Sequence, residues 1–215
     1  MKTSFYDPSD SEFTRHYRDE VQMVFSGMDC ILHGGDAIYC SSELTSGYNL
    51  VKALREYDLK TAAELKQKLG SVWFKENIWD TNVNAAVNFA EAVRSMAPNK
   101  TLVITPAPFS APGWSQHEYL AFWESLLRTR VRLVWFNRNW QYSNGCAFEF
   151  AVAQDAGLAT YDYQGKILDR ETGISLLEEG IKELDLEGLD TNLLRENLAR
   201  LSQSRLQNPT ARART

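Results

Sequence analysis

Four short, continuous apolar runs alternate along this chain with longer segments of helical periodicity, and this alternation constrains the fold more than any other feature. The runs cover residues 37–40, 101–104, 131–136 and 158–161. Glycine or proline residues precede three of them, as is usual where a loop leads into a strand. Because the runs do not alternate with polar residues, we expect strands buried on both faces, as in a parallel sheet covered by helices.

The segments between these runs place apolar residues at helical spacing. In residues 82–96, for example, Val83, Ala86, Ala90 and Val93 share one helical face. Alternating strands and helices predict an α/β fold, a Rossmann-like or flavodoxin-like three-layer sandwich with a mainly parallel sheet and extra N- and C-terminal helices. The predicted helices cover residues 9–25, 49–57, 59–69, 82–96, 115–127, 145–156, 172–184 and 189–201.

A chain of 215 residues is long enough for one well-buried core and short for two. We therefore expect a single α/β domain over residues 1–204. Residues 49–80 are predicted to form a helical insertion, because this stretch is longer than a minimal crossover needs. Residues 205–215 lack periodicity, and we expect a flexible tail there.

Composition excludes several classes of function. The formal charge of -5 disfavours a surface that binds a nucleic-acid polymer, because such surfaces need clustered Lys and Arg. No apolar run approaches the roughly 18–20 residues of a membrane span, so we expect a cytoplasmic protein without a membrane partner. The three cysteines and three histidines are scattered, with no spacing typical of metal ligands. We expect no metal and no cofactor.

Ligands of parallel α/β sheets bind in the crevice beyond the carboxyl ends of the strands. The segments that follow the first three predicted strands, 41–48, 105–114 and 137–149, are therefore the candidates for a site. The segment 41–48 holds Ser41, Ser42 and Gly47, whose hydroxyl and backbone N–H groups are suited to a phosphate. A plain polar loop explains the same residues. The Walker pattern is absent, so ATP hydrolysis is not indicated.

The third of these segments is the most informative. A helix is predicted to begin near Ser143, Asn144 and Gly145, and helix N-termini bind anions through unpaired backbone N–H groups. Glu149 follows between one and two helical turns later, with apolar residues around it, and a carboxylate in such surroundings tends to have a perturbed pKa. The alternative is that Ser143 is only an N-cap and Glu149 only a solvated helix residue.

Aromatic residues near these loops can wall a base-binding pocket, because nucleobases stack on flat faces. We expect Phe109 and Trp114 in the second segment, together with Tyr142, to form such a pocket. A rigid loop with a core tryptophan is the alternative explanation.

Taken together, these residues resemble the nucleoside 2-deoxyribosyltransferase superfamily, and within it the nucleotide N-hydrolases. The first strand and loop of that family carry a tyrosine and small residues, which 38–47 resembles. The catalytic loop of the family is similar to Ser143-x-Gly145-x-x-x-Glu149. Deoxyribosyltransferases commonly have Asp where this chain has Ser143, whereas the hydrolases have Ser. The resemblance covers residues 37–163 and leaves out the terminal helices.

The resemblance implies that Glu149 is the nucleophile in hydrolysis of the base–sugar bond of a (deoxy)nucleoside 5′-monophosphate. It also implies that Tyr39 contacts the site and that Ser143 and its neighbours hold the phosphate. The acidic residue that many members carry before the third strand is replaced here by Arg128, Thr129, Arg130 and Arg132. The general acid is therefore open, and Asp80, His117, Glu118 and Tyr142 are the candidates.

The resemblance leaves other functions open. Base exchange on a deoxynucleoside, a nucleotide-sensing module without turnover, and a site that has diverged to another glycosidic substrate all fit the same residues. Members are often oligomers, so we expect a homodimer or larger homo-oligomer. The tryptophans Trp73, Trp79 and Trp123 fit either an interface or a core.

Overall fold

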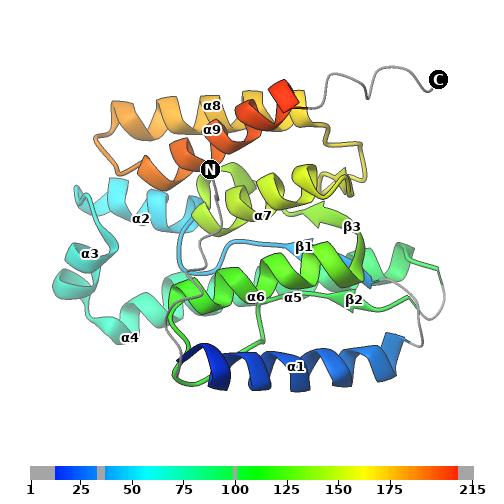
Figure 1. The fold of residues 1–215 in the computed structure, drawn as a ribbon. Helices are drawn as coiled ribbons and strands as arrows, with labels where there is room; N and C mark the ends of the chain where they lie inside the picture. The colour runs from blue at the N-terminus through cyan, green and yellow to red at the C-terminus, as the bar shows by residue number, and fades with distance from the viewer. Residues whose placement is uncertain (1–12, 33–36, 99–100, 208–215) are drawn as a thin grey trace.

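The computed structural model describes residues 13–32, 37–98 and 101–207 (Figure 1). A short π-helical segment, Lys75–Trp79, leads into α5, and a 3-10 turn, Trp140–Tyr142, precedes α7. The strands are β1 (Ala37–Ser41), β2 (Val103–Ile104), β3 (Val131–Phe136) and β4 (Ala159–Tyr161). The helices are α1 (Phe13–Leu32), α2 (Tyr48–Tyr57), α3 (Ala62–Leu69), α4 (Ser71–Phe74), α5 (Asp80–Met96), α6 (Gln116–Arg130), α7 (Asn144–Asp155), α8 (Arg170–Leu186) and α9 (Asn192–Gln207).

The four strands form one parallel sheet in the order β2-β1-β3-β4, which confirms the predicted α/β class. In the register of the sheet, Tyr39 of β1 lies opposite Ile104 of β2 and Val134 of β3. The chain passes from β1 to β2 on one side and then returns across β1 to β3 on the other. The direction of winding therefore reverses beside β1, and this reversal is where open α/β sheets form their ligand crevice.

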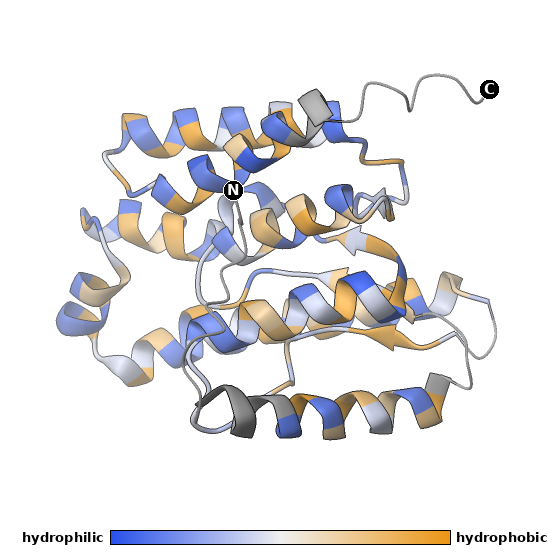
Figure 2. Ribbon diagram, viewed as in Figure 1, coloured by the Kyte–Doolittle hydropathy of each residue, from blue (hydrophilic) through white to orange (hydrophobic). Residues whose placement is uncertain are grey.

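Successive residues of the strands point to opposite faces of the sheet, and each face has its own helices. On one face, Ile38 and Cys40 pack with Ala90 and Val93 of α5. On the other face, Tyr39 belongs to the main core with residues of α6 and α7. Figure 2 shows the hydrophobic colouring concentrated along the strands and the inner helices. The result is the predicted three-layer sandwich.

The terminal helices lie outside these layers. Helix α1 lies along α6, where Phe25 stacks on Phe122 with ring centroids 5.3 Å apart, and α8 and α9 cover α7 at the top of Figure 1. The extra helices expected at both ends are therefore present. Helix α1 continues beyond the predicted end at residue 25, and the first residues of that prediction, 9–12, lie outside the described part.

Two further boundaries differ from the sequence-based expectation. Residues 71–79 belong to the predicted helical insertion, although no separate helix was assigned to them, and they are helical and join α3 to α5. With α2 and α3 they form a small core of their own around Leu65, Phe74 and Ile78. Helix α9 continues to Gln207, past the expected end of the domain at 204, and the rest of the expected tail, 208–215, lies outside the described residues. None of the described helices has the length and apolar character needed to cross a membrane.

Close packing of α8 against α7 depends on Gly173. A Cβ atom at this position would lie 2.1 Å from Cζ of Phe150, whose side chain is fully buried. We expect Gly173→Ala to lower the free energy of unfolding by about 1–3 kcal/mol, because an overpacked core cannot relax freely. The control is Gly27→Ala in α1, where no atom lies within 4 Å and helix propensity predicts a gain of roughly 0.5–1 kcal/mol. Urea unfolding measures both, and a gain from Gly173→Ala would contradict the packing described.

Candidate active site

A cavity of about 450 Å³ opens at the carboxyl ends of the strands, where the crevice was predicted. Its walls come from the loops after β1 and β2, from α6, from the start of α7 and from α9. The residues that line it are Ser42, Leu44, Thr45, Ser46, Trp79, Pro106, Phe109, Ser110, Gln116, Tyr119, Leu120, Trp123, Ser143, Asn144, Gly145, Phe148, Glu149, Leu193, Glu196 and Asn197.

Glu149 is the buried carboxylate of this cavity, with a relative exposure of 6%. Both of its oxygens are held by residues of β1. The phenol of Tyr39 donates to Oε1 at 2.7 Å, and the hydroxyl of Ser41 donates to Oε2 at 2.5 Å. Tyr39 and Ser41 are two residues apart on a strand, so they point to the same face, towards α7. The interpretation of Glu149 as a solvated helix residue is therefore wrong.

Burial raises the pKa of Glu149 to about 7, and the two donated hydrogen bonds oppose that rise because they stabilise the ionised form. Burial also raises the pKa of Tyr39 well above its usual value, and the nearby Glu149 raises it further. The Tyr39 phenol therefore keeps its proton and remains a donor at neutral pH. The arrangement holds a carboxylate in a fixed orientation, with a pKa suited to chemistry near neutrality.

The N-terminus of α7 forms a second, polar part of the cavity. Ser143 caps the helix, since its hydroxyl accepts from the N–H of Cys146 at 3.4 Å, and it lies 3.3 Å from the hydroxyl of Ser46. The first backbone N–H groups of a helix have no partner within the helix, and they include those of Asn144 and Gly145. Capping and anion binding are thus compatible here.

Ser42 adds a further donor to this polar end. Its hydroxyl is buried and has no hydrogen-bond partner among the described residues, although the residue lines the cavity. A buried polar group without a partner costs free energy unless water or a ligand satisfies it. Together with Thr45, Ser46 and the α7 N-terminus, Ser42 forms what we call the hydroxyl cradle, defined by Ser42, Thr45, Ser46 and Ser143.

Gly47 shapes the loop of the cradle and does not itself line the cavity. Its φ is +106°, and a Cβ there would lie 2.1 Å from Oε2 of Glu43. Glu43 accepts from the N–H of Tyr48 at 2.7 Å, and its burial raises its pKa to about 7. On the other side of the loop, the amide of Asn82 donates to the carbonyl of Leu44 at 2.8 Å. Sequence reasoning missed both Glu43 and Asn82.

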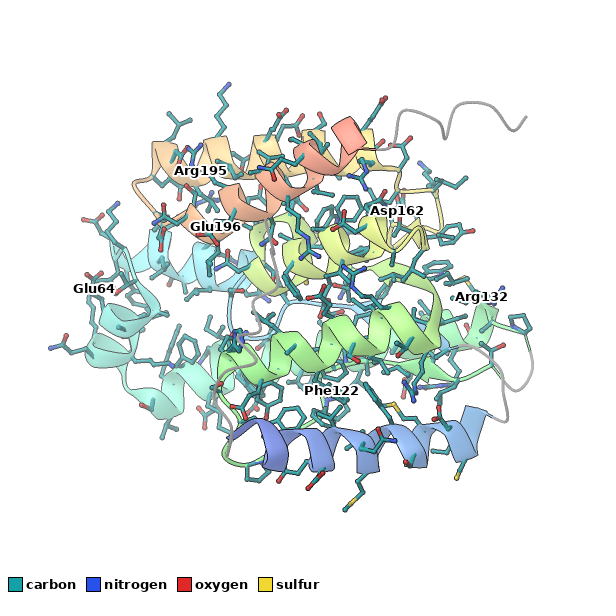
Figure 3. All side chains as sticks on the ribbon, viewed as in Figure 1. Glu64, Phe122, Arg132, Asp162, Arg195 and Glu196 are labelled. Carbon is teal, nitrogen blue, oxygen red and sulfur yellow. The ribbon has the colours of Figure 1, made fainter. Side chains whose placement is uncertain are left out.

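The aromatic residues divide into two groups. Phe109 lines the cavity and stacks on Phe122, with ring centroids 5.1 Å apart, and it meets Trp123 edge-on. Figure 3 labels Phe122 on α6, facing α1. Trp114 packs against Phe109 but does not line the cavity, and its indole N–H donates to Glu20 at 2.7 Å.

Tyr142 also lies away from the cavity lining. Its phenol donates to Glu183 at 2.6 Å, and its ring packs against Tyr48. Of the three residues expected in a base pocket, the structure therefore places Phe109 at the cavity and Trp114 and Tyr142 outside its lining. Of the tryptophans considered above for an interface or a core, Trp123 is buried in the main core, and both Trp79 and Trp123 line the cavity.

The candidates for a general acid are not brought to Glu149. Asp80 forms an ion pair with Lys75 at 2.7 Å and does not line the cavity. Glu118 accepts from the N–H of Ser115 in a capping box that starts α6, and His117 beside it is exposed. The acidic residue that sequence reasoning overlooked is Glu196 of α9, which lines the cavity and is labelled in Figure 3.

Comparison with known proteins adds no relative on which to base an assignment. No protein-family model matches the chain, no curated protein matches it, and no solved structure matches it. The geometry of the cavity therefore carries the functional argument.

The raised pKa of Glu149 predicts how stability depends on pH. Burial favours the protonated form, so the contribution of Glu149 to stability is complete below pH 4.5 and is lost as pH rises through about 7. The expected loss is about 3 kcal/mol. Glu149→Gln removes this pH-dependent loss. The free energy of unfolding of the variant should therefore match that of the wild type near pH 4.5 and exceed it at pH 8.5.

Urea unfolding of both proteins across this range measures the difference. Glu43 changes stability in the same direction in both, so the difference between the proteins isolates Glu149. Parallel curves for wild type and variant would show that Glu149 is not a buried carboxylate with a raised pKa.

Proposed function

We propose that this protein hydrolyses the N-glycosidic bond of a nucleoside 5′-monophosphate, with Glu149 as the nucleophile. The observation that carries the proposal is the placement of one buried carboxylate, held at both oxygens by Tyr39 and Ser41, in a cavity with a hydroxyl cradle and aromatic walls. The three parts of this cavity fit the sugar, the phosphate and the base of a nucleotide, respectively.

Cleavage of an N-glycosidic bond builds positive charge on the anomeric carbon of the sugar. In the proposed mechanism a Glu149 oxygen attacks that carbon, the carbon–nitrogen bond breaks, and the base leaves with the bonding pair and takes up a proton from water. A second water then attacks the anomeric carbon of the glycosyl ester, gives its hydroxyl to the sugar and its proton to solvent, and restores the Glu149 carboxylate. Tyr39 and Ser41 fix the direction of attack and keep a fraction of Glu149 ionised at neutral pH.

The hydroxyl cradle is the proposed phosphate site. Among the described residues, the lining of the cavity contains no Lys, Arg or His. Hydroxyl donors, backbone N–H groups and the positive end of the α7 dipole would therefore bind the phosphate. The unpartnered hydroxyl of Ser42 supports this assignment, because a phosphate oxygen gives it the acceptor that the protein does not. Binding energy from the phosphate then orients the sugar over Glu149.

Base exchange is the alternative reaction at the same site. It needs the same carboxylate and glycosyl ester, and a second base takes the place of water. Product analysis with an acceptor base added separates the two reactions.

Chromatographic detection of free base tests the proposal directly. Wild type should release base from some member of a panel of nucleoside monophosphates, and Glu149→Ala should lower the rate by roughly a thousandfold or more, because it removes the nucleophile. Ser143→Asp keeps a good N-cap but brings a negative charge to the cradle. It should lower kcat/KM for monophosphates by roughly ten- to a hundredfold and spare nucleosides.

Two results would contradict the proposal. One is the absence of base release from every monophosphate and nucleoside, with and without an acceptor base. The other is release that survives Glu149→Ala unchanged. Equal losses on nucleotides and nucleosides in Ser143→Asp would reject the cradle as the phosphate site while leaving the role of Glu149 intact.

A further inference from the structure

Helix α9 gives the cavity a wall that lies outside the segment 37–163 of the family resemblance. Leu193, Glu196 and Asn197 line the cavity, and their spacing of three and four residues places them on one face of the helix. Other positions of α9, Leu194 and Leu201, are buried in the main core. The helix is therefore anchored by one face and presents another to the ligand space.

The polar groups on this wall include two hydrogen-bond acceptors. Asn197 has a relative exposure of 6% and donates one amide N–H to the carbonyl of Leu193 at 2.8 Å, so its amide oxygen is an acceptor and its second N–H is a donor. Glu196 forms no hydrogen bond or ion pair with any residue that the structure describes. The neighbouring cation does not neutralise it, because Arg195 pairs with Asp185.

The apolar residue of this wall, Leu193, also indicates a site for a ligand. Leu193 has a relative exposure of 48%, although it lies beside a cavity with the rings of Phe109 and Trp123 in its lining. An exposed apolar side chain next to hydrogen-bond acceptors is typical of a ligand-binding site. The apolar side chain can cover the face of a flat ring, and the acceptors can bind donors at its edge.

We propose that the α9 wall is the base subsite and that Glu196 and Asn197 accept hydrogen bonds from the exocyclic amino group of the base. The inference rests on the proposed function, and it specifies the substrate class as amino-substituted bases, such as adenine and cytosine. An oxo group in place of the amino group presents an acceptor to a carboxylate and an amide oxygen, which leaves polar groups unpaired and adds repulsion.

Two matched pairs of nucleotides test this inference. dAMP has an amino group where dIMP has an oxo group, and dCMP differs from dUMP in the same way. In each pair the adjacent ring nitrogen is an acceptor in the amino member and an N–H donor in the oxo member. Wild type should favour the amino member of each pair by about tenfold or more in kcat/KM, with the difference in KM. Glu196→Gln should reduce this preference to less than about threefold, because the glutamine amide can also donate a hydrogen bond to an oxo group. The matched control is Glu179→Gln on the exposed side of α8, which should leave the preference unchanged.

Measurements of nucleotide binding test this inference independently of the proposed reaction. Calorimetry on Glu149→Ala measures the affinity of the same four nucleotides without turnover. A preference for the amino members that Glu196→Gln removes supports the inference, even if wild type releases no base and the proposed reaction fails. Base release with no amino preference, a preference that Glu196→Gln leaves unchanged, or no binding of any of the four would overturn the inference.

Discussion

The two hydrogen bonds from β1 to the carboxylate of Glu149 are the interaction on which the rest of the site depends. They join β1, one of the two inner strands of the sheet, to α7, and they give a buried carboxylate two donors from Tyr39 and Ser41. An ionised carboxylate in an apolar core is costly, and these donors offset part of that cost. The sequence around Glu149 follows from this constraint: its neighbours on α7 are buried apolar residues, so the donors to its carboxylate come from β1.

The same constraint links stability to function. A carboxylate whose pKa is about 7 lowers stability above neutral pH, and a protein retains such a group where chemistry uses it. The loop after β1 holds a second carboxylate with a raised pKa, since Glu43 is half-buried and accepts from the N–H of Tyr48. Glu43, Gly47 and Asn82 fix the loop that carries the cradle hydroxyls, so that Ser46 lies beside Ser143 at the α7 N-terminus and Ser42 lines the same cavity. The cavity is thus preorganised by the backbone on one side and by a buried carboxylate on the other.

Much of the fold could be predicted from the sequence, because short continuous apolar runs between turn signals are typical of strands in a covered sheet. Ser143, Gly145 and Glu149 were found for a similar reason: a strand, a loop and a helix start in succession place them at the crevice. Residues 71–79 were predicted only as part of a helical insertion and not as a separate helix, since the π-helical turn at Lys75–Trp79 breaks the regular period. Asp80 was misplaced because its pairing with Lys75 depends on that same segment. Leu193, Glu196 and Asn197 carry no motif, and only the three-dimensional path of α9 brings them to the cavity.

The central claim is that Glu149 attacks the anomeric carbon, and mass spectrometry of a trapped glycosyl ester tests it most directly. A 2′-deoxy-2′-fluoro nucleoside monophosphate slows breakdown of the ester, because fluorine disfavours positive charge at the adjacent carbon. After incubation, the intact protein should gain the mass of the fluorinated sugar phosphate without the base, and the modified peptide should be the one that contains Glu149. Base release without any adduct, or an adduct on another residue, would contradict the account.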